Sequence, residues 1–180
     1  MHSFDYFDKA LPYDQFLSTF GKPTDKARWD RVRDMIKLTD AQTSLLKKFV
    51  RQTKIVVLAG AWCGDCAGQC PILEKFAEFA PCLQIRYLDR DVHAEAQAEL
   101  QINGGNRVPV AVFFSEDGKE VARFGERTLT QYRRMVAEMG GEACGTGLGS
   151  DGYAADWLDQ VERVQWILRL SPRLRKLHAD

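Results

Sequence analysis

The sequence lacks a net charge, a long apolar stretch and a visible secretion signal. Lysine and arginine number 25, as do aspartate and glutamate, so no overall field favours nucleic acid or an anionic membrane. The longest apolar run, residues 55–62, is far too short to span a bilayer. The first residues include Asp5 and Asp8 and no apolar signal segment. We therefore expect a cytoplasmic protein that binds neither nucleic acid nor membranes.

Cysteine is also scarce, and its count is odd. The chain has five: Cys63, Cys66, Cys70, Cys82 and Cys144. In a reducing compartment, this number argues against a framework of structural disulfides and suits one working pair with spare thiols. We interpret Cys70 as a small core residue and Cys82 and Cys144 as bystanders.

The composition is that of a globular protein. Hydrophobic residues make up 45% of the chain and charged residues 28%, unlike a disordered sequence. A chain of 180 residues can form one domain that buries roughly 70% of its unfolded surface. A second full domain is not expected.

The apolar pattern predicts helices first and then strands that alternate with helices. Early helices are expected over residues 11–20, after a cap at Thr24, and after Thr39, where Gln42 completes a capping box. Strands are expected over residues 54–60, 83–88, 108–114 and 120–124. Later helices are expected over residues 64–79, 91–100 with Asp91 as the cap, 128–139 with Thr128 at its start, and from 153 to a break at Ser171–Pro172. The first two strands should be parallel and the last two should form a hairpin.

These elements suggest four segments within one compact domain. Residues 1–52 form an N-terminal helical extension packed on the core, and residues 53–140 form that core. Residues 141–152 are a glycine-rich linker, and residues 153–180 are a C-terminal amphipathic helical extension. The basic residues near the C-terminus are expected to face solvent.

One short motif carries most of the chemistry. Residues 62–66 read Trp-Cys-Gly-Asp-Cys and lie between an apolar strand and a helix. Two cysteines separated by two residues at such a junction can close into a small disulfide and reopen. The motif therefore indicates a redox site formed by Cys63 and Cys66.

Residues 61–66 resemble the active-site motif of the thioredoxin family, and the resemblance extends over residues 54–139. Pro71 falls at the helix-kinking proline of that family, Val108–Pro109 resembles its cis-proline segment, and Gly125 matches the glycine beside its substrate groove. The resemblance implies an α/β thioredoxin fold, with a central mixed four-stranded sheet flanked by helices. It also implies a thiol–disulfide oxidoreductase that acts on protein disulfides in cell redox homeostasis.

The resemblance further implies roles for individual residues. Cys63, just before the helix, attacks a substrate disulfide, and the less accessible Cys66 resolves the mixed disulfide. Gly64 allows a tight turn beside Cys63. The substrate groove is formed by Trp62, Val108, cis-Pro109 and Gly125. A reductase or a small thiol supplies electrons, and no bound cofactor or metal is needed because the cysteines carry the electrons.

Four departures from the family pattern affect these expectations. Asp65 replaces the usual proline between the cysteines, and its charge should raise the pKa of Cys63 against a dominant opposing effect of the helix N-terminus. Val57 replaces a buried acid, so we expect Cys66 to resolve slowly. Tyr87 replaces a lysine near that acid, and residues 4–7 are a weak candidate for the family's opening strand.

Two other classes of protein remain open at this stage. Cys63, Cys66 and Cys70 could together hold a metal ion or an iron–sulfur cluster. Alternatively, the scaffold could be an interaction module whose terminal helices bind a partner.

Overall fold

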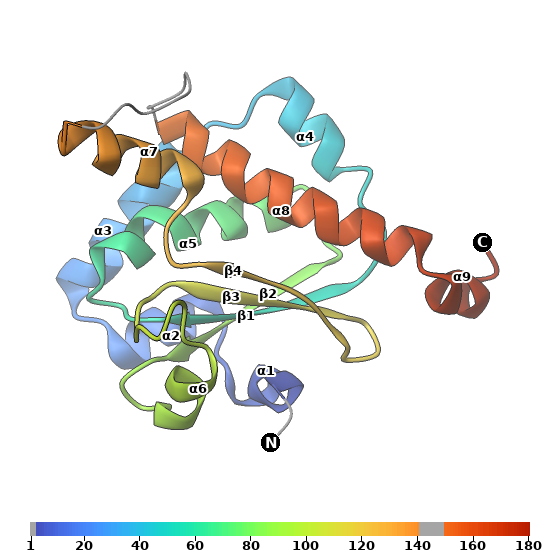
Figure 1. Ribbon diagram of the computed structural model, residues 1–180, viewed down its shortest axis with the longest axis horizontal. Helices are drawn as coiled ribbons and strands as arrows, with labels where there is room; N and C mark the ends of the chain where they lie inside the picture. Colours follow the sequence, from blue (N-terminus) through green and yellow to red (C-terminus); the bar gives the residue numbers. More distant parts are fainter. Residues whose placement is uncertain (1–2, 141–149) are drawn as a thin grey trace.

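The computed structural model describes residues 3–140 and 150–180, which form a mixed sheet covered by helices on both faces (Figure 1). The strands are β1 (Thr53–Ala59), β2 (Leu83–Asp89), β3 (Val110–Ser115) and β4 (Glu120–Gly125). They lie in the order β2-β1-β3-β4. The expected α/β architecture with a mixed four-stranded sheet is confirmed.

Strand β1 is one of the two inner strands of the sheet. β1 pairs in parallel with β2 and antiparallel with β3, and β3 pairs antiparallel with β4. Ile55, Val57 and Ala59 have no exposed surface. An apolar strand of this kind is favoured when helices cover both faces of a sheet. The loop after Ala59 therefore starts from a rigid central strand.

Helices α5 (Gly64–Ala77), α7 (Leu129–Glu138) and α8 (Ser150–Leu170) lie on one side of the sheet (Figure 1). On the other side lie α1 (Tyr6–Lys9) and α6 (Ala94–Glu99), and α2 (Tyr13–Phe20) packs beside β2. Helix α3 (Pro23–Met35) packs against α5. Helix α4 (Asp40–Leu46) begins at Thr39, whose side chain forms the expected capping box with Gln42.

Aromatic packing joins the N-terminal helices to the sheet. The ring of Trp29 in α3 contacts those of Tyr13, Phe16 and Tyr87 at centroid distances of 5.8–6.0 Å. The Trp29 Nε1–H also donates to the carbonyl oxygen of Ala61 at 2.9 Å. Helix α3 is thereby tied directly to the loop that follows β1.

Three expectations about local structure were wrong. Residues 4–7 are not a strand, because Ser3–Asp5 form a 3-10 turn and α1 follows it. Instead, Leu11 and Tyr87 exchange backbone hydrogen bonds of 2.7 and 2.8 Å. Helix α3 begins after Lys22 with Pro23 in its first turn, so Thr24 does not cap it.

Asp91 is not the cap of α6, which begins later, after His93. The Asp89 carboxylate accepts the backbone N–H groups of Asp91 and Val92, at 2.9 and 3.1 Å. The Asp91 carboxylate instead accepts the indole N–H of Trp62. The Asp89 carboxylate is thus bonded within the local turn, and the Asp91 carboxylate is available for the long-range contact with Trp62.

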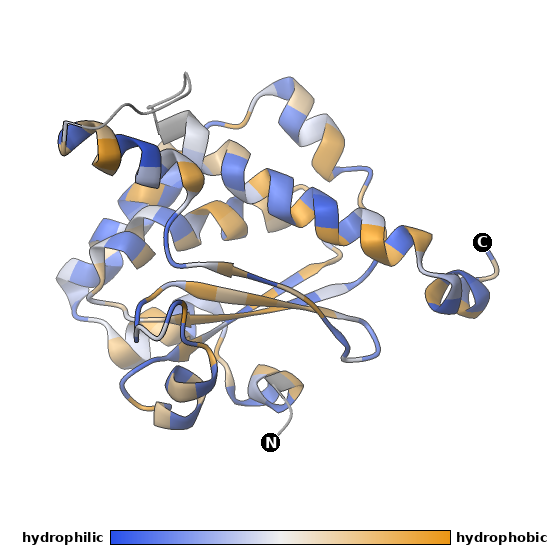
Figure 2. Cartoon of the chain, viewed as in Figure 1, coloured by the Kyte–Doolittle hydropathy of each residue, from blue (hydrophilic) through white to orange (hydrophobic). Residues whose placement is uncertain are grey.

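Helix α8 alternates apolar and polar residues along its length (Figure 2). Its apolar stripe is buried and consists of Trp157, Leu158, Val161, Val164 and Leu168. Ser171 separates it from α9 (Pro172–His178), as expected. The basic end faces solvent, as expected, and there Arg173 pairs with Asp117 and His178 with Glu116 in the β3–β4 turn.

No helix within residues 3–140 and 150–180 combines the length and the apolar character that crossing a bilayer requires. Cys144 and most of the expected linker lie outside the described residues.

Candidate functional site

The Trp-Cys-Gly-Asp-Cys motif lies at the junction of β1 and α5. Cys63 is the N-cap residue of α5, with φ −73° and ψ 129°. Its sulfur accepts the backbone N–H of Cys66 at 3.4 Å. A side-chain acceptor at this position satisfies one of the N–H groups that every helix leaves unpaired at its start. The local fold thus aims one sulfur at the helix N-terminus.

The two sulfurs differ in accessibility. Cys63 retains 9% of its surface, whereas Cys66 retains none. Both are free thiols. The Cys63 thiol also donates to the carbonyl oxygen of Val108, at 3.7 Å. A reagent from solvent can reach Cys63, and Cys66 lies beneath it.

The residues expected around the groove come together here. The Val108–Pro109 peptide is cis, the conformation that the resemblance implied. Gly125 has φ +155°, and a Cβ added to it would lie 2.5 Å from the carbonyl oxygen of Pro109. The position therefore needs glycine, because both the backbone angle and the space exclude a side chain.

A shallow cleft surrounds Cys63. It is lined by Trp62, Cys63, Asp65, Arg90, Asn106, Arg107, Val108, Glu126 and Arg127. Trp62 is 49% exposed and its indole N–H donates to Asp91 at 3.0 Å. The guanidinium of Arg90 lies over the Trp62 ring, 4.7 Å from its centroid. Trp62 thus forms a fixed aromatic wall of the cleft.

A thioredoxin family model matches residues 11–139, which is more than half of the chain. The chain belongs to the thioredoxin family. The match includes β1 to β4, the two motif cysteines and cis-Pro109.

Two solved structures have a similar fold over most of the chain, and a third matches about half of it. A protein of unknown function from Pseudomonas aeruginosa is 17% identical, with a TM-score of 0.73, and the match covers 91% of this chain and 96% of that one. An HIV epitope scaffold is 18% identical, with a TM-score of 0.70 and coverage of 91% and 97%. A thioredoxin from Fasciola hepatica is 28% identical, with a TM-score of 0.37 and coverage of 53% and 88%.

The pKa of Cys63 is raised from its ordinary value, which contradicts the expectation that the helix N-terminus dominates. The Cys66 thiol and burial raise it, while the backbone N–H groups of Cys66 and Asp65 lower it. Burial, followed by the neighbouring Cys70 thiol, raises the pKa of Cys66. Both sulfurs therefore favour the neutral form in the reduced protein.

The side chain of Asp65 does not have the effect expected from the sequence. Its carboxylate accepts the amide N–H of Gln131 at 2.7 Å and pairs with Arg127 at 3.1 Å. What Asp65 contributes to the pKa of Cys63 is a backbone N–H that lowers it. The like-charge repulsion expected from this carboxylate is thus offset by its ion pair with Arg127.

Sequence reasoning missed several polar residues behind the motif. Gln69, Glu126 and Gln131 are 1%, 4% and 7% exposed. The Glu126 carboxylate binds Arg107 at 2.9 Å and the Tyr132 hydroxyl at 2.7 Å. A glutamine three residues after Cys66 in a helix that packs on the sheet was a usable signal, because buried amides require partners.

No acid stands at Val57, but Glu74, a half-buried acid, belongs to a different element, helix α5. Val57 has no exposed surface and pairs with Tyr87 in the sheet. The Tyr87 hydroxyl donates to Glu74 of α5 at 2.8 Å. Burial raises the pKa of Glu74. This glutamate lies two helical turns beyond Cys66 along the same face of α5.

A metal site has little support from the geometry. Among the residues that the structure describes, no three histidine, cysteine or acidic side chains converge so that they could hold a metal ion. Cys70 is buried and lies beside Cys66. It matches the expected small core residue.

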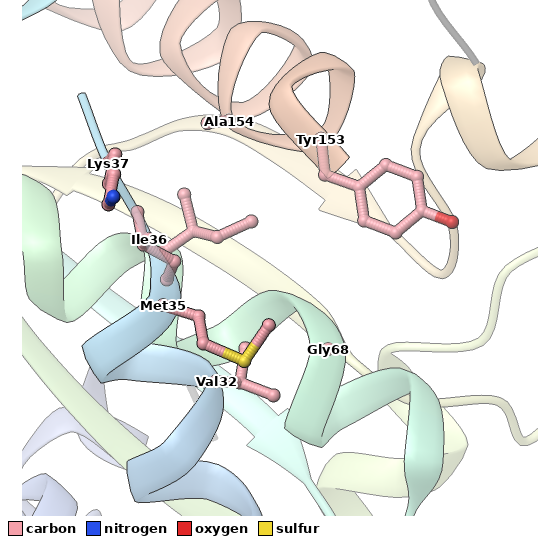
Figure 3. A pocket seen from close by; sticks show the side chains of 8 residues that line it. Val32, Met35, Ile36, Lys37, Gly68, Tyr153 and Ala154 are labelled. Atoms are coloured by element: carbon pink, nitrogen blue, oxygen red, sulfur yellow. The ribbon is translucent and has the colours of Figure 1, made fainter. Parts of the chain in front are cut away.

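A separate apolar cavity of about 260 Å³ lies between α3, α5 and α8 (Figure 3). Val32, Met35 and Ile36 line it from the α3 side, and Tyr153 lines it from α8. Gly68 of α5 also lines it. No residue expected from the sequence to act at the redox motif lines this cavity.

Proposed function

We propose that the protein is a thiol–disulfide oxidoreductase that acts on protein disulfides by cycling Cys63 and Cys66 between the dithiol and the disulfide. One observation carries the proposal: a reachable sulfur caps a helix N-terminus, and a second sulfur lies buried three residues on. This arrangement lets one sulfur meet a substrate while the other is kept for the second step.

The reaction balances within these two side chains and the substrate. Cys63 loses its proton, and its thiolate attacks a substrate disulfide, forms a mixed disulfide and expels one substrate thiolate, which takes up a proton. Cys66 then loses its proton and attacks the Cys63 sulfur, and the second substrate thiolate leaves. The substrate gains two electrons and the protein ends as the Cys63–Cys66 disulfide. A reductase or a small thiol returns the electrons, so no bound cofactor is required.

The cleft suits an extended polypeptide. The Val108 carbonyl lies against the Cys63 sulfur, and cis-Pro109 follows it directly. An extended substrate segment can pair with backbone beside Val108 in strand fashion, with Trp62 as an apolar wall. We propose disulfide-containing cytoplasmic proteins as partners, with neither nucleic acid nor membranes involved.

The proposal is tested by reduction of insulin disulfides with dithiothreitol as the electron source. The wild-type protein should accelerate the reaction, and both Cys63→Ser and Cys66→Ala should abolish the acceleration. Cys63→Ser should leave no reachable nucleophile, whereas Cys66→Ala should accumulate a mixed disulfide that mass spectrometry detects. Cys82→Ser is the matched control, because this free thiol does not line the cleft around Cys63. Acceleration that persists in Cys63→Ser would rule the proposal out.

A further inference from the structure

A chain of hydrogen bonds connects the C-terminal helix to the redox motif. The Trp157 indole N–H in α8 donates to Gln69 Oε1 at 3.3 Å. Gln69 Nε2 donates to Gln131 Oε1 at 3.4 Å and to the Glu126 carbonyl oxygen at 3.1 Å. Gln131 Nε2 donates to the Asp65 carboxylate at 2.7 Å. Helices α5, α7 and α8 and the loop after β4 thus meet beside the motif.

The two end groups, an indole and a carboxylate, fix the donor-to-acceptor direction of this chain of hydrogen bonds. An indole N–H can only donate and a carboxylate can only accept, whereas a glutamine amide does both. The donor at Trp157 therefore requires the oxygen of Gln69 to face it, which turns the Gln69 nitrogen toward Gln131. Gln131 must then present its own nitrogen to Asp65. Only one orientation of the two amides satisfies both ends.

Burial makes this orientation strict. Trp157 has no exposed surface, and Gln69 and Gln131 are 1% and 7% exposed. Reversing either amide would leave a buried donor or acceptor without a partner, which costs about 1–3 kcal/mol. Trp157 is itself held by edge-to-face packing on Phe124, with ring centroids 4.6 Å apart. The two amides that orient the Asp65 carboxylate are therefore anchored to a tightly packed tryptophan.

We propose that Trp157, Gln69 and Gln131 act as positioning residues that keep the Asp65 carboxylate in its ion pair with Arg127, and so relieve the Cys63 thiolate of a neighbouring negative charge. The proposal rests on the proposed function and assigns part of the control of the site to the C-terminal helix α8. It explains how an aspartate can stand between two cysteines that must ionise.

Other charged groups also face Cys63. Asp65 belongs to α5 and Arg90 follows β2, while Arg107, Glu126 and Arg127 come from the segments before β3 and after β4. The Cys66 thiol lies beneath. A test of the amide chain should therefore change no charge other than that of Asp65.

The test is the pH profile of Cys63 alkylation by iodoacetamide in the reduced full chain, read by peptide mass spectrometry. Gln131→Leu removes the last amide, and Trp157→Phe removes the initial donor while keeping an aromatic ring. Each should slow labelling at pH 8 by about threefold or more and move the profile upward, since a tenfold change equals one pKa unit. In an Asp65→Asn background, neither substitution should change the rate by more than about 1.5-fold, because no charge is left to release.

Gln165→Leu is the matched control. Gln165 is 2% exposed and bonds to Arg51 and Thr53 at the other end of β1. Its loss should lower stability and leave the Cys63 profile unchanged. The proposal would be overturned if Gln131→Leu slowed labelling equally in the wild-type and Asp65→Asn backgrounds. It would also be overturned if Gln131→Leu left the pH profile of Cys63 labelling unchanged. Failure of wild-type Cys63 to be labelled at all would instead defeat the proposed function.

Discussion

Gly125→Ala should strongly destabilise the protein, because Gly125 lies where the chain passes closest to Pro109. The residue has φ +155°, which side-chain-bearing residues rarely adopt and which costs them about 1–3 kcal/mol. The new Cβ would also lie 2.5 Å from the Pro109 carbonyl oxygen and 3.0 Å from the Val110 Cα. Both neighbours are backbone atoms of the central strand region and cannot rotate away. We expect a loss of about 3 kcal/mol in the free energy of unfolding.

Urea unfolding followed by circular dichroism measures this loss. With a slope of about 2 kcal/mol per molar urea, the midpoint should fall by about 1.5 M. Insulin reduction should slow as well, because moving Pro109 shifts the Val108 carbonyl away from Cys63.

Gly68→Ala is the matched control for Gly125→Ala. Gly68 lies within α5, and a Cβ there meets no atom within 4 Å. Alanine in a helix interior should raise stability by about 0.5–1 kcal/mol. If Gly125→Ala left the midpoint within experimental error of the wild type, the steric reasoning about the groove would be refuted.

Two further predictions follow from the site. Because the pKa values of Cys63 and Cys66 are raised in the folded state, the unfolded chain releases these protons first, at about 8.5. The stability of the reduced protein should then be fully present below that pH and decline above it. Urea midpoints at pH 7 and pH 9.5 measure the decline, and a decline of equal size in Cys63→Ser/Cys66→Ser would contradict the assignment. Trp29→Phe removes the 2.9 Å hydrogen bond to Ala61 from a fully buried site and should cost about 2–3 kcal/mol. It should also slow Cys63 labelling, because that bond holds the loop before Cys63. Thermal melts measure the loss of stability, and alkylation measures the labelling rate. Labelling at the wild-type rate would show that the loop keeps its shape without this hydrogen bond.

The features that were predictable from the sequence depend on neighbours close along the chain. The capping box of Thr39 and Gln42 and the cap at Thr128 each join residues three positions apart, and both form as expected. The apolar run of β1 and the break at Ser171 are equally local. Asp91 is not a cap because Asp89, two residues earlier, accepts the backbone N–H groups of the same turn. The contact between Asp91 and Trp62 joins residues that only the fold brings together.

The expected role of Asp65 failed for the same physical reason. From the sequence, the only visible partner of this carboxylate is the neighbouring cysteine, so repulsion is the natural expectation. Its amide partner, Gln131 of α7, lies 66 residues further along the chain. Gln131 is oriented through Gln69 by Trp157 of helix α8. Buried amides are unfavourable in a core unless each donor and acceptor is paired, so Gln69 and Gln131 mark a polar network even where its members cannot be named in advance.

The same argument changes what the C-terminal helix contributes. A helix that only covered apolar surface could be replaced by any amphipathic segment of similar volume, because hydrophobic burial has no direction. Trp157 does more than fill space, since its single N–H fixes the orientation of two amides in sequence. In our proposal, directional contacts of this kind make the chemistry of the motif depend on α8, even though none of the described side chains of α8 lines the cleft around Cys63. The site around Cys63 is therefore assembled from residues on both sides of the segment 141–149, and in our proposal this assembly is what makes Asp65 compatible with a thiolate between the cysteines.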